Sequence, residues 1–391
     1  MYPDFSYIFH DLLGSAPDNW LSVFKTFGFF LVLAILSAAR ILFWELRRKA
    51  GEGIFHSQKV SITLNKPATA VDYAGNIGFG FLVGFKLLYI LRHFETFQAD
   101  AAAVIMSLKG DWFGGLALGA AFGVYQWYSS RRLASIPPKE EEKEIFPHNR
   151  IGEITMIAAV AGVLGAKVFA IMETPPDSLK ELAKLLFSGS GLTIYGGLIG
   201  GFLGVAWYLR KHKIPLTPVL DAVAPALIVA YGVGRLGCHF SGDGDWGIAA
   251  GPQPSWWFLP QWLWAYDYPH NIINEGVRMA NCTLAHCKHL DPPVFPTSVY
   301  ESLMAFSIGG ILWALRKKLH TPGLLFFTYL IFNGLERFFI EKIRVNVHYD
   351  LMGFKATQAE IIAVLLLLTG IAGWVVLWRR KSNQLRPTNN N

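Results

Sequence analysis

The chain has 391 residues, of which 52% are hydrophobic and only 16% are charged, whereas a soluble protein of this length carries about a quarter charged residues. The apolar residues are gathered in blocks close to the length that crosses a lipid bilayer, which indicates an all-α polytopic membrane protein. Most of the net charge of +7 lies in short loops between these blocks, so it reports membrane topology and excludes a nucleic-acid-binding function.

The lengths of the apolar blocks predict about nine transmembrane helices in a single domain that covers residues 1–391. Basic clusters such as Arg47-Arg48-Lys49 and Arg379-Arg380-Lys381 follow alternate blocks. The positive-inside rule then places the N-terminus outside, the C-terminus in the cytoplasm and the 248–297 loop outside. The spans are expected near residues 24–44, 76–94, 112–129, 152–172, 192–209, 218–235, 298–315, 322–341 and 357–378.

Two parts of the chain resemble each other at a nearly constant offset. This offset predicts an inserted helix pair at 70–133 that resembles 150–213, although the need for small residues at helix contacts in lipid would by itself produce part of the match. Lys86 and Lys167 are expected to lie deep enough to need a polar partner. The matching segments are Gly84-Phe85-Lys86-Leu87-Leu88 with Gly165-Ala166-Lys167-Val168-Phe169, and Phe113-Gly114-Gly115-Leu116 with Tyr195-Gly196-Gly197-Leu198.

The segment 234–247 combines a cation, carboxylates and several glycines directly after the apolar run 222–233. Arg235, Asp243 and Asp245 are therefore expected where a helix leaves the bilayer, a depth at which charges are expensive and usually functional. The glycines let a backbone approach a ligand closely. The alternative is a polar loop with an arginine that only reaches the membrane interface.

A second cluster of basic residues lies on the same predicted outer side, which is an exception to the positive-inside rule. Arg337, Glu341 and Arg344 follow the eighth apolar block at i, i+4 and i+7, a spacing that predicts one shared helix face. One interpretation is an ion-paired helix end. The other is an anion site that faces the same outer cavity as Arg235.

The cysteines of the 248–297 loop are spaced as Cys282-x4-Cys287, with His286 and His289 nearby. An oxidising compartment favours a disulfide between these two cysteines. A metal site is the alternative, but four candidate ligands within eight residues fit no common zinc spacing. Two unpaired thiols are a third possibility. No metal and no other cofactor is predicted for the chain.

Four segments, Tyr195–Gly200, Gly234–Gly247, Phe295–Glu301 and Asn333–Arg344, carry polar and glycine-rich motifs in a fixed order along the chain. Together they resemble the motifs of the bacterial prolipoprotein diacylglyceryl transferase family. The resemblance covers about 24–48 and 150–380, whereas 70–130 and most of 248–290 look like insertions. Tyr195–Gly200 resembles the family's His-Gly-Gly-Leu-Ile-Gly loop, Gly234–Gly247 its Gly-Arg-x-Gly-Asn-x-x-Asn-x-Glu-x-x-Gly signature, Phe295–Glu301 its Pro-Ser/Thr-Gln-x-Tyr-Glu element, and Asn333–Arg344 its Gly-x-x-Arg-x-x-x-Glu-x-x-Arg element.

The resemblance implies a transferase of the bacterial inner membrane with its active site toward the outer side. Its substrates would be the membrane lipid phosphatidylglycerol and the lipobox cysteine in the signal peptide region of an exported prolipoprotein. The product would be a thioether, and glycerol-1-phosphate would leave. The rival hypothesis is a lipid-binding or transport protein that uses the same anion cavity without catalysis. A third is a head-group transferase with another acceptor.

The resemblance also assigns site residues. Arg235 and Arg337 would bind the phosphate and stabilise the charge of the leaving group, and Gly247 and Glu341 match family positions. The remaining substrate-binding residues predicted from these segments are Arg344, Gly196, Gly197, Tyr300 and Glu301.

Three departures from the family pattern affect the chemistry. Tyr195 replaces the family's functional histidine, and Cys238 and Phe27 replace an asparagine and a tyrosine. A phenol with a pKa of about 10 is a poor general base at neutral pH. His239 is therefore predicted to supply the missing imidazole, the alternative being a loop histidine without a role. Asp243 is predicted to replace the family glutamate, with Asp245 as an equal candidate because of one extra residue before Trp246.

Overall fold

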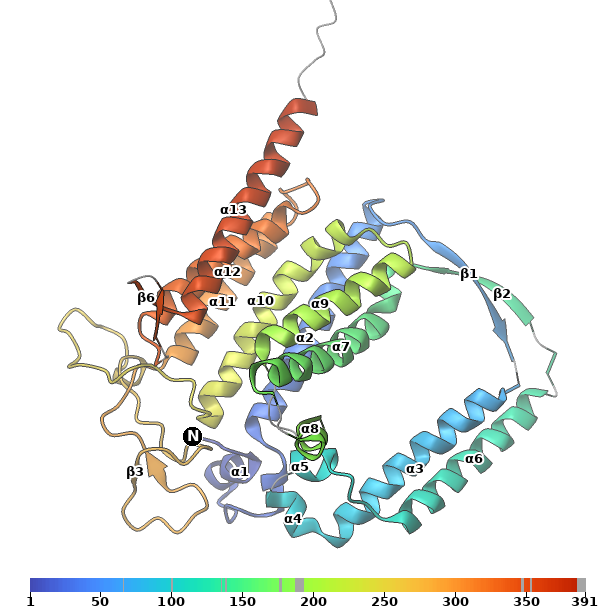
Figure 1. The fold of residues 1–391 in the computed structure, drawn as a ribbon, viewed down its shortest axis with the longest axis horizontal. Helices are drawn as coiled ribbons and strands as arrows, with labels where there is room; N and C mark the ends of the chain where they lie inside the picture. Colours follow the sequence, from blue (N-terminus) through green and yellow to red (C-terminus); the bar gives the residue numbers. More distant parts are fainter. Residues whose placement is uncertain are drawn as a thin grey trace, which may run out of the picture. The chain divides into compact units, whose positions relative to one another are not determined.

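The computed structural model describes residues 1–65, 67–99, 101–134, 136–137, 139–175, 178–186, 193–345, 348–351 and 354–384. This part of the chain is mostly helical (Figure 1), which confirms the predicted all-α polytopic architecture. It divides into two compact units, Met1–Ile54 with Pro215–Asn391 and Phe55–Ile214.

Among the described residues, six helices are long and apolar enough to cross a membrane. They are α2 (Thr26–Gly51), α3 (Ala70–Arg92), α7 (Ile151–Glu173), α10 (Leu216–Ser241), α11 (Thr297–Leu315) and α13 (Gln358–Gln384). The other three predicted spans coincide with α6 (Trp112–Ala134), α9 (Ile194–Lys211) and α12 (Leu324–Glu341), which are not among these six helices. The number of nine spans and the orientation of the termini therefore stay predictions.

The remaining elements of the described chain are short. The helices are α1 (Phe5–Leu13), η1 (Trp20–Val23), η2 (Pro147–Arg150), η3 (Gln261–Leu263), α4 (Phe94–Ala99), α5 (Ala101–Met106) and α8 (Leu179–Leu186). The strands form three antiparallel pairs, β1 (Gln58–Leu64) with β2 (Lys139–Ile145), β3 (Val277–Arg278) with β4 (Lys288–His289), and β5 (His348–Leu351) with β6 (Phe354–Thr357).

In the first unit, α10 packs against α2 and α11, and α12 packs against α13. The core between α10, α11 and α12 consists of small and branched side chains that include Ala224, Ile228 and Leu312. Asp221 of α10 is buried and accepts hydrogen bonds from the backbone N–H groups of Gly323 at 2.8 Å and Phe326 at 3.0 Å. A carboxylate at a helix N-terminus satisfies N–H groups that have no partner within the helix. Asp221 thereby fixes α12 against α10.

The loop between α10 and α11 is held by aromatic packing and by a covalent bond. Cys282 and Cys287 form a disulfide with a Cα–Cα distance of 5.6 Å, so the disulfide alternative is confirmed and the metal alternative for these sulfurs is excluded. Tyr268 is fully buried beside Trp246 and Val294. The loop therefore has a core of its own against which the end of α10 is held.

In the second unit, α3 packs with α6 and α7 packs with α9, and both pairs are close because glycines face the partner backbone. A Cβ on Gly84 would lie 2.1 Å from the carbonyl oxygen of Gly114. A Cβ on Gly165 would lie 2.3 Å from the carbonyl oxygen of Gly196. Small residues permit such backbone contact between helices in lipid.

The two deep lysines have the same kind of partner in both pairs. Lys86 Nζ donates hydrogen bonds to the carbonyl oxygens of Val104 at 2.9 Å and Lys109 at 2.8 Å. Lys167 Nζ donates one to the carbonyl oxygen of Leu185 at 2.7 Å. Each lysine thus reaches the backbone of the segment that joins the two helices of its pair, which is the polar partner that its depth requires.

The substitution Gly165→Ala should lower the melting temperature of the protein, because the new methyl group would overlap the backbone of α9. Overpacking of this kind costs about 1–3 kcal/mol. Gly152→Ala is the matched control, since it adds the same methyl group to the same helix with nothing within 4 Å. Thermal unfolding of the detergent-solubilised variants measures the difference, and equal melting temperatures for the two variants would contradict the close packing of α7 on α9.

Candidate active site

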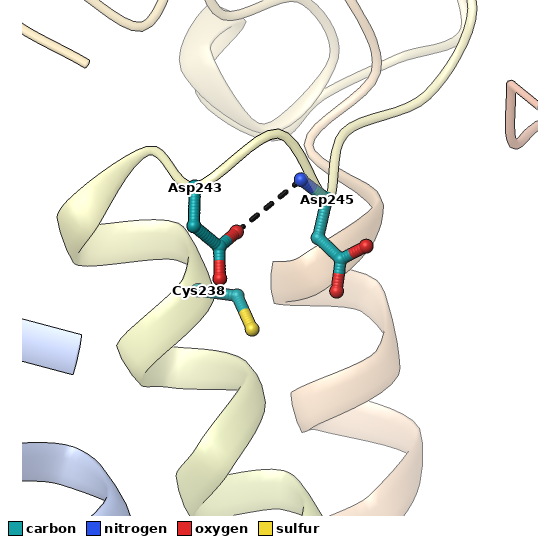
Figure 2. A group of neighbouring side chains, drawn as sticks. All are labelled: Cys238, Asp243 and Asp245. Atoms are coloured by element: carbon teal, nitrogen blue, oxygen red, sulfur yellow. Dashed lines mark hydrogen bonds between the residues drawn. The ribbon is translucent and has the colours of Figure 1, made fainter. Parts of the chain in front are cut away.

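The candidate site begins where α10 ends. Gly242 takes a left-handed conformation with φ of 63°, and its N–H donates to the carbonyl oxygen of Cys238 at 3.0 Å. This is the usual way for a glycine to end a helix. Gly244 also has a positive φ of 99°, so the chain turns sharply twice. Figure 2 shows that the turns bring Asp243 and Asp245 back over the last turn of the helix, beside Cys238.

Arg235 and Arg344 share the same two carboxylates. Arg235 forms ion pairs with Asp245 through Nη1 and with Glu301 through Nε. Arg344 pairs with Asp245 at 2.5 Å and with Glu301 at 2.8 Å. Tyr231 donates a hydrogen bond to Glu301 at 2.8 Å. Glu301 is completely buried, and its carboxylate is the shared partner of both guanidinium groups.

Arg337 adds a third cation to this centre. It lies 3.8 Å from Glu301 and pairs with Glu341 at 3.1 Å. Glu341 accepts a hydrogen bond from the Thr357 hydroxyl at 2.7 Å. Arg235 of α10 and two arginines of the segment 337–344 therefore converge on one buried carboxylate. Removal of one partner from such a buried ion pair strongly destabilises the folded protein.

The prediction that Arg344 shares a helix face with Arg337 and Glu341 was wrong. Helix α12 ends at Glu341, and Arg344 lies beyond it. The reason is a competing backbone contact, since Arg344 forms an isolated antiparallel bridge with Gly247 and the Ile248 N–H donates to the Ile343 carbonyl oxygen at 2.9 Å. The chain after α12 is thus tied to the signature loop.

Gly247 is explained by that backbone contact. A Cβ on Gly247 would lie 2.6 Å from the carbonyl oxygen of Ile343 and 2.8 Å from Thr297. The glycine therefore allows the segment that carries Arg344 to reach the end of α10. Gly196 and Gly197 lie in the first turn of α9 with Tyr195, and Gly196 packs on Gly165 as described above. The helix contact alone accounts for Gly196.

The two aspartates have opposite electrostatic surroundings. Burial, reinforced by the neighbouring Asp245, raises the pKa of Asp243 above its usual value. Burial alone would also raise the pKa of Asp245, but the charges of Arg235 and Arg344 outweigh it and hold that pKa below its usual value. The N–H of Asp245 donates to Asp243 at 3.2 Å (Figure 2). Asp245 is therefore the carboxylate of the ion-pair network, and Asp243 supports the loop.

Cys238, Asp243 and Asp245 offer three atoms within 4.8 Å of one another, a spacing that could hold a metal ion. Both Asp245 oxygens are already engaged by guanidinium groups. Those cations would compete with a metal ion for the same oxygens. We therefore interpret the trio as the edge of the ion-pair network.

Replacing Asp243 by asparagine should raise the melting temperature near neutral pH, because a carboxyl with a raised pKa in the folded state is destabilising when ionised. Its favourable contribution is complete below the unfolded-state pKa of about 3.9 and is lost as the pH rises through the folded-state value. The gain should be a few degrees, at about 2–4 °C per kcal/mol, and should vanish as the pH approaches about 4. Thermal unfolding across this pH range measures it; a gain that increases in acid would contradict the assigned direction of the pKa.

His239 lies on a separate side of the site. It is buried, its Nδ1 is 3.2 Å from the Tyr268 hydroxyl, and its ring contacts those of Tyr266 and Phe240. Within the described part of the chain, its contacts are thus aromatic and not with the arginines. It also lines a cavity of about 630 Å³ together with Met1, Tyr2, Tyr7, His10, Asp11, Phe240, Trp262, Tyr266, Pro269, His270 and Leu284.

The structure adds contacts that the sequence motifs do not indicate. Tyr231 lies one helical turn before Arg235, with the arginine 5.0 Å above its ring, and the i, i+4 spacing was a signal for this pair. Thr357 was not predicted because it is distant in sequence from Glu341. Tyr300 was predicted in the site, but its hydroxyl donates to the carbonyl oxygen of Leu263, so it anchors the loop.

Fold and site together define a polytopic membrane protein with a buried, arginine-rich centre suited to an anionic ligand. A family model described as prolipoprotein diacylglyceryl transferase matches residues 100–376. The chain therefore belongs to this family, which confirms the resemblance of the four motifs. The match begins inside the 70–133 helix pair.

Similar proteins come from several bacteria, and each is called a phosphatidylglycerol–prolipoprotein diacylglyceryl transferase. One from Leptospira interrogans is 25% identical over 292 residues, which cover 62% of this chain and 83% of the relative. One from Corynebacterium glutamicum is 30% identical over 199 residues, covering 50% and 59% respectively. One from Enterococcus faecalis is 27% identical over 263 residues, covering 66% and 83%.

Proposed function

We propose that this chain transfers diacylglyceryl from phosphatidylglycerol to the thiol of the lipobox cysteine in an exported prolipoprotein. The sulfur forms a bond to the terminal glyceryl carbon, and the bond between that carbon and its phosphate oxygen breaks. Glycerol-1-phosphate leaves with the electron pair of that bond, and the thiol proton passes to a base. The names of the relatives support this reaction.

The observation that carries the proposal is the convergence of Arg235, Arg337 and Arg344 on Glu301. Arginine keeps its proton even in a poor dielectric, and its planar group forms paired hydrogen bonds with phosphate oxygens. Such fixed donors stabilise the charge that develops on the leaving group. Arg235 and Arg337 are assigned this role, with Arg344 as a further phosphate ligand.

The acceptor thiol also has to lose its proton, since a free thiol of pKa ~8.5 is mostly protonated at neutral pH. His239 and Asp243 are the proposed bases. The raised pKa of Asp243 brings it closer to that of the thiol, which improves proton transfer. Tyr195 is proposed to donate a hydrogen bond to the phosphate, and Gly197 to let the backbone approach the lipid.

The charge pattern of the loops supports a location of this reaction at the outer side of the bacterial inner membrane. An exported acceptor presents its cysteine on that side, so both substrates would meet at the C-terminal end of α10. The alternative function, lipid binding or transport without chemistry, would use the same arginines but would leave phosphatidylglycerol unchanged. The relatives favour the transferase.

The proposed function is tested by supplying the purified chain with phosphatidylglycerol and a lipobox peptide. Release of glycerol-1-phosphate that depends on the peptide is the expected result. Binding of the lipid with no release, under conditions in which the Leptospira interrogans relative turns over, would instead support the non-catalytic alternative.

A further inference from the structure

The geometry points to a second role for Asp245: its carboxylate occupies the position in which the phosphate of the lipid binds, and phosphate binding requires this side chain to leave. The inference rests on the proposed function in one respect, because it takes the phosphate of the anionic substrate lipid as the ligand. It adds that the site carries its own anion, which competes with the substrate.

Asp245 is bound between two arginines through both of its carboxylate oxygens. One of its oxygens contacts Arg235 Nη1, and the other contacts Arg344 Nη2 at 2.5 Å. Two oxygens of a phosphate group can make the same pair of charge-assisted contacts. The two arginines are thus already spaced for an anion with two neighbouring oxygens.

Asp245 has a more exposed side chain than Arg235, Arg344 and Glu301. The side chain of Asp245 is 32% exposed, whereas those of Arg235 and Arg344 are 13% and 11% exposed and that of Glu301 is completely buried. An incoming anion therefore meets Asp245 first and cannot reach Glu301 without moving the arginines. Of the two shared carboxylates, Asp245 is the one that a ligand can replace.

Arg344 has one hydrogen-bond donor that the ion-pair network does not use. The Nε–H of Arg344 is buried without a hydrogen-bond partner in the described structure, and a buried donor in that condition is destabilising. The two oxygens of the Asp245 carboxylate are spent on Arg235 Nη1 and Arg344 Nη2. A phosphate group has further oxygens, so it can make both of those contacts and also accept from Nε.

The side chain of Asp245 can move independently of its backbone. Asp245 follows Gly244, whose φ is 99°, and its backbone is held by Asp243 and by the Thr297 hydroxyl, each at 3.2 Å. Because these contacts involve only the backbone of Asp245, the side chain can rotate away while the loop stays in place. The carboxylate then compensates the arginines in the absence of lipid and yields to the phosphate when lipid arrives.

With competition of this kind, the apparent affinity for the phosphate equals the intrinsic affinity multiplied by the fraction of molecules whose site is free. Asp245→Asn keeps the shape of the side chain but removes the charge that holds it between the arginines. It should therefore bind glycerol-1-phosphate at least ~5-fold more tightly than the wild type, which corresponds to a site that is free in at most about a fifth of wild-type molecules. Asp267→Asn is the matched control, because it makes the same substitution in the loop that follows, at a carboxylate paired with His289 and not with the arginines of the site, and we expect a change below about 2-fold.

The test is equilibrium binding of radiolabelled glycerol-1-phosphate to the full chain in detergent, for the wild type and both variants. Tighter binding confined to Asp245→Asn supports the inference. Equal or weaker binding by Asp245→Asn shows that Asp245 is a structural support of the arginines and overturns it.

A second measurement uses the wild type and avoids any folding defect of the variants. Carbodiimide-driven coupling of a small amine to Asp245, read by peptide mass spectrometry, should increase when glycerol-1-phosphate is added, because the carboxylate leaves its two cations. Unchanged or reduced coupling at saturating ligand would overturn the inference. Turnover with phosphatidylglycerol and peptide is measured in parallel, so an absent reaction is attributed to the proposed function and not to Asp245.

Discussion

Alanine at Arg235 or at Arg337 should reduce turnover by about a hundred- to a thousandfold or more, because each guanidinium is assigned to the phosphate and to the charge of the leaving group. Arg→Lys at either position should restore little activity, since an ammonium group cannot reproduce the planar pair of hydrogen bonds. Initial rates of glycerol-1-phosphate release, normalised to monodisperse protein, measure the effect.

The control for these variants is Arg316→Ala. Arg316 follows α11 and pairs with the buried Glu45 at 2.6 Å, so its loss also leaves a buried carboxylate without this partner, outside the candidate site. We expect this variant to lose stability and to keep the wild-type rate per folded molecule. Full activity in either alanine variant of the site would remove that arginine from the mechanism, and full activity of a lysine variant would show that positive charge alone is sufficient.

His239→Gln should lower turnover by about a hundredfold, as expected for the loss of a general base. Glutamine preserves a polar group near the Tyr268 hydroxyl, so the substitution tests the imidazole more than the packing. The measurement is turnover against pH for the wild type, His239→Gln, Asp243→Asn and Tyr195→Phe. A proton acceptor should change the pH profile as well as the rate.

The outcomes of this comparison separate the three candidates. If His239→Gln keeps both the rate and the pH profile of the wild type, His239 is not the base. A changed profile in Asp243→Asn alone would assign proton transfer to that carboxyl. A loss confined to Tyr195→Phe, with an unchanged profile, would identify the phenol as a hydrogen-bond donor to the phosphate.

The helices and two of the local contacts followed from local sequence patterns. Long apolar runs predicted the helices, because length and hydropathy alone determine whether a segment can cross a bilayer. The i, i+4 spacing of Arg337 and Glu341 left an ion pair as one of two interpretations, and the structure contains that ion pair. The cysteine spacing and the expected compartment favoured the disulfide that the structure contains.

What could not be predicted depends on contacts between distant segments. The helical spacing of Arg344 was overridden by its backbone bridge to Gly247, which no local pattern encodes. Sequence alone left Asp243 and Asp245 equivalent, and only the positions of Arg235 and Arg344 distinguish them. The central place of Glu301 likewise required α10, the chain after α12 and α11 to be brought together.

The most direct test of the transferase is the mass of the acceptor. A synthetic lipobox peptide is incubated with the purified chain and phosphatidylglycerol of defined acyl chains, beside a peptide in which serine replaces the cysteine. The cysteine peptide is expected to gain one diacylglyceryl group, with one glycerol-1-phosphate released per peptide, and the serine peptide is expected to stay unchanged. An unmodified cysteine peptide, in an assay in which the Leptospira interrogans relative modifies it, would contradict the account.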